Sequence, residues 1–167
     1  FQKAIAGFRR FIEILETVPD IVDAPDAKPL EVSAGHIRYS DVRFSYDGEE
    51  EVIRGLDLDI APGETIALVG PSGGGKSTTC SLLPRFYDVE AGSVEIDGQD
   101  VRSVTQKSLR EAVGIVQQDV YLFDGTIAEN IAYGRPGATA EEIREAARLA
   151  NADAFVSAMP DGYDTQV

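Results

Sequence analysis

The feature that most constrains the fold is a glycine-rich segment at residues 70–77, which reads Gly-Pro-Ser-Gly-Gly-Gly-Lys-Ser. Its spacing, G-x-x-x-x-G-K-[ST], is typical of a loop that joins a buried strand to a helix and holds phosphate. The apolar run at residues 65–69 predicts that strand, and residues 77–83 predict the helix. In such a turn, backbone N–H groups, the positive end of the helix dipole and Lys76 all favour a polyphosphate. The segment therefore indicates an α/β fold with a phosphate site rather than a chance glycine-rich turn.

Composition places the chain among ordinary soluble globular proteins, with 43% hydrophobic and 26% charged residues over a length of 167. The net charge of −14, from 29 acidic and 15 basic residues, argues against a nucleic-acid partner, which would require a basic surface. No apolar run approaches the ~18 residues of a membrane-spanning helix, so we expect these residues to be soluble. The single cysteine, Cys80, cannot form an internal disulfide, and we expect a buried, inert thiol.

The N-terminal region predicts a helix followed by a linker. Apolar side chains recur at helical spacing through residues 1–17, and Pro19 ends that helix. Residues 19–35 contain three prolines and several acids, which is typical of an extended linker. We therefore expect the first helix to be an appendage or a joint to another domain, although a place in the core is the alternative.

The remaining chain predicts antiparallel strands first and a mixed strand–helix part afterwards. Strands are expected at residues 37–46, 56–60, 65–69, 93–96 and 113–116, with a weak helix near residues 105–111. Two segments have the sequence pattern of a capping box at the start of a helix, Thr126 with Glu129 and Thr139 with Glu142. This order favours an α/β fold with an added β layer.

Together with the glycine-rich loop, two further segments identify a family. They are Phe44-Ser45-Tyr46 and residues 117–123, which read Gln-Gln-Asp-Val-Tyr-Leu-Phe. With these, the chain resembles the nucleotide-binding domain of an ATP-binding-cassette (ABC) exporter, the type whose membrane helices run directly into this domain. The resemblance implies an incomplete P-loop NTPase (RecA-like) core, preceded by an antiparallel β subdomain and a helix. It also implies that residues 1–18 continue a membrane-domain helix, that 19–35 are the linker, and that 36–167 are the N-terminal part of the nucleotide-binding domain.

The resemblance also assigns site residues for ATP and Mg²⁺. Tyr46 would stack on adenine, although its spacing equally allows a place in the core beside Val42 and Phe44, and Ile53 would touch the base. Gln118, the glutamine directly before an acidic residue, would reach the metal and the attacking water, whereas its neighbour Gln117 would not. Residues of the loop and the following helix would hold the phosphates, with Ser77 also on Mg²⁺ and Thr78 on the α-phosphate: Gly70, Ser72, Gly73, Gly74, Gly75, Lys76, Ser77 and Thr78. Gly74 stands where many relatives have serine, a departure that matters little because backbone groups hold the phosphate.

Three sequence features of the family are missing from these 167 residues. No apolar run ends in Asp-Glu, the Leu-Ser-Gly-Gly-Gln signature is absent, and the sole histidine, His36, precedes the first strand. The resemblance therefore implies that these residues bind nucleotide at best, without meaningful turnover. The parent protein would couple Mg-ATP binding and hydrolysis to export at the cytoplasmic face of the cell membrane. Its partners would be transmembrane domains of the same chain and a second nucleotide-binding domain, as a homodimer or a heterodimer.

Two other functions remain open. One is a non-catalytic interaction module that responds to nucleotide, and the other is a small-molecule kinase with the same type of loop. In addition, the strand at residues 65–69 would lack the neighbour that normally follows it in this fold. An unpaired apolar edge is a template for pairing with another chain, so we expect these residues to be marginally stable alone, to self-associate or exchange elements, or to rearrange their strands.

Overall fold

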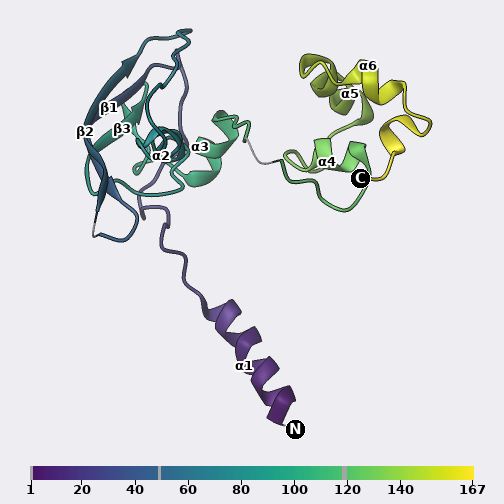
Figure 1. Ribbon diagram of the computed structural model, residues 1–167, viewed down its shortest axis with the longest axis horizontal. Helices are drawn as coiled ribbons and strands as arrows, with labels where there is room; N and C mark the ends of the chain where they lie inside the picture. Colours follow the sequence, from purple (N-terminus) through teal and green to yellow (C-terminus); the bar gives the residue numbers. More distant parts are fainter. Residues whose placement is uncertain (1, 49, 118–119) are drawn as a thin grey trace. The chain divides into compact units, whose positions relative to one another are not determined.

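The computed structural model describes residues 2–48, 50–117 and 120–167 (Figure 1). The chain separates into two compact units, residues 1–115 and residues 116–167. The first unit contains helix α1 (Gln2–Glu16), which confirms the expected N-terminal helix, and a four-stranded sheet. Within the described residues, no helix is both long and apolar enough to cross a bilayer.

The sheet is antiparallel, with the strand order β2-β1-β3-β4. Its strands are β1 (Ile37–Ser45), β2 (Glu51–Ile60), β3 (Ala91–Ile96) and the short β4 (Gln99–Asp100). The antiparallel β subdomain expected from the sequence is therefore confirmed, and β4 is an element that the sequence did not predict. β3 and β4 join at Asp97-Gly98, where both residues have positive φ (48° and 76°), as a tight hairpin turn requires.

A bulge in β1 decides which of its side chains enter the core. Pairing is irregular between Tyr39 and Val42, and Asp41 has a φ of 41°. The bulge shifts the alternation, so Tyr39, Val42 and Phe44 are all buried on one face. Opposite the bulge, a Cβ on Gly92 would lie 2.2 Å from the carbonyl oxygen of Ser40, so only glycine fits there.

Two short helices cover the buried face of the sheet (Figure 1). Helix α2 (Lys76–Leu82) contributes Leu82 and helix α3 (Gln106–Ala112) contributes Leu109, and both leucines are fully buried. The Tyr39 hydroxyl donates to the carbonyl of Thr79 in α2 over 3.0 Å, and burial raises the pKa of this phenol. This contact ties the helix after the glycine-rich loop to the central strand.

The strands expected at residues 65–69 and 113–116 are not formed, which corrects the sequence prediction. Both segments lie outside every strand of the described structure. Val69 is 89% exposed, and Val116 is fully exposed. A strand requires a neighbour to pair its N–H and C=O groups, and neither segment pairs with a strand of the described sheet. The apolar character of these two segments was therefore not enough to make them strands.

The proline-containing segment at residues 19–35 is hydrogen-bonded to the rest of the first unit at several points along its length. Lys28 forms an isolated bridge with Val104, and Glu31 exchanges two hydrogen bonds with the Gln99 side chain. Near its end, one carboxylate, that of Asp97, accepts four backbone N–H groups from residues 33–36. These bonds hold the pKa of Asp97 well below its usual range. The segment is thus extended, but it is docked rather than free.

The second unit contains α4 (Ile127–Ala132), α5 (Ala140–Leu149), α6 (Asp153–Ser157) and the 3₁₀ turn η1 (Gly162–Asp164). Both predicted capping boxes are confirmed, at Thr126 and at Thr139. Its small buried core includes Ala147 and Val156. The Tyr163 hydroxyl donates to Asp153 over 2.7 Å and links η1 to α6.

Candidate functional site

The glycine-rich loop forms a hollow directly before α2. A cavity of about 370 Å³ is lined by residues 72–78 together with Tyr46 and Val52. The loop is closed by a hydrogen bond of 3.2 Å from the Gly74 N–H to the Pro71 carbonyl. At Gly75, φ is +78° and a Cβ would lie 3.2 Å from the Val52 carbonyl, so the backbone approach to β2 requires glycine. The predicted phosphate residues Ser72 to Thr78 therefore surround one space.

Lys76 supplies the positive charge of this hollow. Its ammonium donates to the carbonyls of Gly70 and Pro71 over 3.0 and 2.7 Å. An ammonium has three donors, so one N–H remains available after these two bonds. Gly70 therefore contributes through its carbonyl to holding Lys76, and it does not line the cavity itself.

The next two residues present hydroxyl groups of different exposure. Ser77 lines the cavity and is exposed, whereas Thr78 is only 5% exposed. Among the residues that the structure describes, no cluster of three carboxylate, imidazole or thiol groups could hold a metal by itself. Mg²⁺ at phosphate sites normally takes one or two protein ligands and completes its shell with phosphate oxygens and water. A single hydroxyl at Ser77 fits that requirement.

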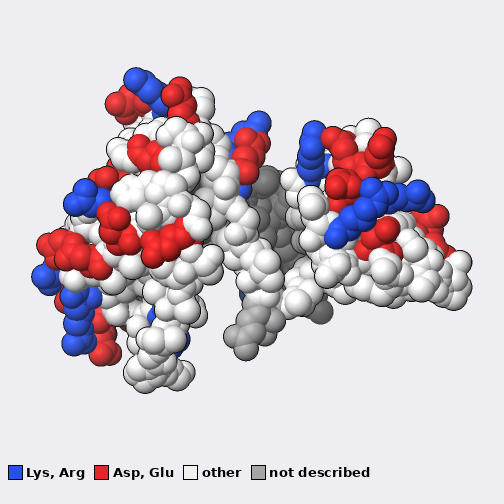
Figure 2. All heavy atoms as spheres, turned by 90° about the horizontal axis from the view of Figure 1, so that it is seen from above, with Lys and Arg blue, Asp and Glu red and all other residues white. Residues whose placement is uncertain are grey.

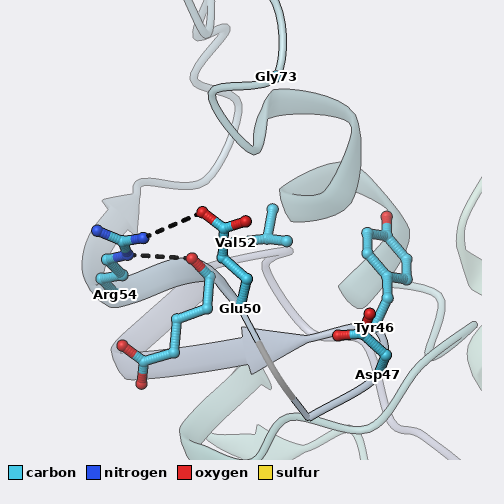
Figure 3. A pocket seen from close by; sticks show the side chains of 7 residues that line it. Tyr46, Asp47, Glu50, Val52, Arg54 and Gly73 are labelled. Atoms are coloured by element: carbon cyan, nitrogen blue, oxygen red, sulfur yellow. Dashed lines mark hydrogen bonds and ion pairs between the residues drawn. The ribbon is translucent and has the colours of Figure 1, made fainter.

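A second cavity, of about 450 Å³, lies beside the first and shares Tyr46, Val52 and Gly73 with it. Figure 3 shows Arg54 on one side of this space and Tyr46 on the other. The Arg54 guanidinium lies 3.6 Å from Glu50 and donates to the backbone carbonyl of Glu51 over 3.0 Å. One space is thus framed by glycine and hydroxyl groups, and its neighbour by an aromatic ring and charged side chains.

Tyr46 lies just beyond the end of β1 and is 56% exposed. It is therefore not a third core member beside Val42 and Phe44, the alternative that the spacing had left open. Its ring meets Phe44 edge-on at 4.9 Å between centroids and Tyr87 at 5.1 Å. Its hydroxyl lies 2.9 Å from the Thr78 hydroxyl. This places the ring at the boundary of the two cavities.

Ile53, another predicted site residue, lines neither cavity. Ile53 is 6% exposed and belongs to the hydrophobic core, whereas its neighbour Val52 lines both cavities. Gln118 lies outside the described residues. The predicted roles of both stay predictions.

The sequence did not single out Val52 and Tyr87 as parts of this region. Val52 could have been found from the period of two along β2, which turns alternate residues to opposite faces. Tyr87 follows α2 and reaches Tyr46 only through the fold, so no local pattern marks it.

The positive charge at the site comes from a single nearby group and not from the overall charge of the protein. Figure 2 shows acidic and basic side chains interspersed on one face of the molecule. The chain has a net charge of −14, so the Lys76 ammonium is a positive group on a negative protein.

Cys80, on the same helix as Lys76, is exposed, which corrects the expectation of a buried thiol.

The family model for the ABC transporter matches residues 53–164. An uncharacterized ABC transporter ATP-binding protein, YwjA of Bacillus subtilis (strain 168), is 50% identical over 167 residues, covering 100% of this chain and 29% of that relative. An ATP-dependent lipid A-core flippase of Syntrophus aciditrophicus (strain SB) is 48% identical over 166 residues, covering 99% of this chain and 28% of the relative.

A solved structure of a bacterial Atm1-family ABC exporter with ATP bound matches 99% of this chain at 43% identity, with a TM-score of 0.89, and the match covers 29% of that exporter chain. The chain thus spans less than a third of the length of the relatives that it matches. The P-loop NTPase fold class expected from the sequence is confirmed by this likeness. On these matches, and on the glycine-rich loop with its lysine, the chain belongs to the ABC transporter family, as a nucleotide-binding domain of the exporter type.

Proposed function

We propose that residues 46–78 bind Mg-ATP and that, in the complete transporter, this binding and the hydrolysis of ATP drive export across the cell membrane. The observation that carries the proposal is the 370 Å³ hollow in which residues 72–78 and the Lys76 ammonium surround one space. Backbone N–H groups of such a loop can surround phosphate oxygens without strain, and the ammonium offsets their charge. Bound Mg²⁺ would neutralise phosphate charge and would be held by Ser77.

Within this proposal, the adjoining 450 Å³ cavity receives the nucleoside, and the exposed ring of Tyr46 offers a stacking surface for adenine. Stacking of a base on an aromatic side chain contributes about 1–3 kcal/mol. Ile53 would touch the base, and Gln118 would contribute to the metal and to the attacking water.

We further propose the wider setting of these residues. A second nucleotide-binding domain would be the partner in hydrolysis, and transmembrane domains of the same chain would carry the substrate. Residues 1–18 would continue a membrane-domain helix, with residues 19–35 as the linker into a nucleotide-binding domain that starts at residue 36. The domain would work at the cytoplasmic face of the cell membrane.

Isothermal titration with Mg-ATP tests the site. We expect wild type to bind and Lys76→Ala to lose most of the heat, because the ammonium is the cationic group of the hollow. Lys107→Ala is the matched control, since Lys107 is an exposed lysine on α3 that pairs only with Glu111 at 3.9 Å among the described residues. Equal heats from wild type and Lys76→Ala would refute the site. Sustained hydrolysis by this chain would contradict the expectation that it binds nucleotide without turnover.

A further inference from the structure

The strongest unassigned feature of the site is a hydrogen bond between the two cavities. The hydroxyl groups of Tyr46 and Thr78 lie 2.9 Å apart, and either can be the donor. Thr78 is 5% exposed and lines the loop cavity, whereas Tyr46 lines both cavities. A buried hydroxyl is rarely left without a partner, and Tyr46 is the partner of the Thr78 hydroxyl among the described residues.

The tyrosine ring is held in the position that makes this bond. Phe44, Tyr46 and Tyr87 form a closed triangle, with centroids 4.9, 5.1 and 5.4 Å apart. Tyr46 meets both neighbours nearly perpendicularly, at 84° and 89°, the edge-to-face geometry that aromatic rings favour. Because Phe44 is buried in the core, the triangle is anchored to β1.

We propose, on the basis of the proposed function, that Tyr46 is a positioning residue for phosphate as well as a stacking surface for the base. An ionised phosphate oxygen only accepts hydrogen bonds, so Thr78 must donate its single proton to it. The oxygen of Thr78 then faces Tyr46 with lone pairs, and the Tyr46 hydroxyl becomes the donor. The result is a directed chain from the Tyr46 O–H to the Thr78 oxygen, and from the Thr78 O–H to phosphate.

This chain has an energetic consequence. Hydrogen bonds in series polarise one another, so the Tyr46 hydroxyl strengthens the donation from Thr78. It also removes the alternative rotamers in which the Thr78 proton points at Tyr46. One side chain thereby connects the nucleoside cavity to the phosphate cavity, with its ring serving the first and its hydroxyl the second.

Titration of Tyr46→Phe with Mg-ATP and with inorganic tripolyphosphate tests the proposal. The variant keeps the ring and loses only the hydroxyl, so we expect both ligands to bind roughly 3- to 10-fold more weakly, in line with one hydrogen bond. Tyr46→Leu also loses the stacking surface, and it should weaken ATP binding further without a further effect on tripolyphosphate. The two variants thus separate the hydroxyl, whose loss weakens both ligands, from the ring, whose loss weakens only ATP further.

Two further variants complete the experiment. Tyr133→Phe is the matched control. It removes a tyrosine hydroxyl in the second unit, and this hydroxyl has no hydrogen-bond partner among the described residues. We therefore expect the affinity for both ligands to be unchanged. Thr78→Val should weaken both ligands, and adding Tyr46→Phe to it should cost nothing more, because the chain is already broken. Circular dichroism of each variant verifies folding.

The outcomes separate this inference from the proposed function. If wild type binds Mg-ATP and Lys76→Ala does not, but Tyr46→Phe binds both ligands as wild type does or more tightly, the positioning role is refuted and the site stands. If the effects of Tyr46→Phe and Thr78→Val simply add, the directed chain is likewise refuted. If wild type binds neither ligand, the proposed function fails, and the positioning role fails with it.

Discussion

Gly92 shows how closely single residues are constrained in the first unit. Its φ is +78°, and an added Cβ would meet the carbonyl oxygens of Ser40 and Asp41 at 2.2 and 2.4 Å. Both oxygens belong to the bulge of β1, so they cannot move without disturbing the strand pairing on both sides of β1. Gly98 is also left-handed, with a φ of +76°, yet a Cβ there would meet nothing within 4 Å.

We expect Gly92→Ala to lower the free energy of unfolding by about 2–5 kcal/mol, because it combines left-handed strain with a backbone clash. Gly98→Ala carries the left-handed strain alone and should cost only about 1 kcal/mol. Urea unfolding followed by circular dichroism measures both. Equal losses would show that the bulge yields to the added methyl group.

At the scale of elements, two helices of the second unit, α4 and α5, begin with a capping box in the first turn. Thr139 accepts from the N–H of Glu142, and the Glu142 carboxylate accepts from the N–H of Thr139 over 2.8 Å. Hydrogen bonds from the backbone and hydroxyl of Thr139, together with nearby Arg135, lower the pKa of Glu142. The capping box thus satisfies two backbone donors at the start of α5.

We predict that Thr139→Ala lowers the free energy of unfolding by about 1 kcal/mol, the usual worth of such a cap. Thr139→Ser keeps the hydroxyl and should be nearly neutral. Both are measured by denaturant unfolding monitored at the helical circular dichroism band. A serine variant as unstable as the alanine variant would mean that the methyl group, and not the cap, matters.

The docking of residues 33–36 predicts a dependence on pH. Hydrogen bonds from four backbone N–H groups lower the pKa of Asp97, so the folded chain releases this proton more readily than the unfolded chain. The stabilisation is therefore fully present above the pKa of about 3.9 in the unfolded chain, and it is lost as the pH falls through the lower folded value.

We expect Asp97→Asn to reduce stability at pH 7 and to flatten the acid limb of the stability curve below about pH 5. Asparagine tolerates the positive φ of 48° at this position, so the turn itself is preserved. Asp26→Asn is the control, because Asp26 is exposed and its carboxylate makes no hydrogen bond or ion pair among the described residues. Parallel acid limbs for wild type and Asp97→Asn would contradict the prediction.

At the scale of the whole molecule, we expect the unpaired segment at residues 65–69 to be the main site of self-association. Ile66 and Leu68 are each 37% exposed, and the backbone around them belongs to no sheet. Exposed extended backbone with apolar side chains can pair with another copy of the chain.

We therefore expect the apparent mass in size-exclusion chromatography with light scattering to rise with protein concentration. Leu68→Lys places a charge in the segment and should shift the population toward monomer, whereas Leu149→Lys, at an exposed leucine of the second unit, is the control for added charge. A stable monomer of wild type across the concentration range would refute self-association.

The nine residues of the loop and its helix start could be located from the sequence because their geometry is local. Glycines at fixed spacing allow the turn, and Lys76 reaches back only five or six residues to its carbonyl partners. The bond between Tyr46 and Thr78 could not be predicted, because it joins residues 32 positions apart. The error at residues 65–69 has the same origin, since a strand exists only where a distant segment pairs with it.

The sequence by itself determined the family, the glycine-rich loop before α2, the capped helices and the antiparallel β layer, because each depends on the short-range spacing of glycine, hydroxyl, acidic and apolar residues. Only the tertiary structure decided which face of β1 is buried, that residues 19–35 are docked through Asp97, and that Tyr46 stands between two cavities with its hydroxyl on Thr78. These features depend on contacts between segments far apart in the chain. The entropy of bringing such segments together is overcome by the whole folded core and by no local pattern.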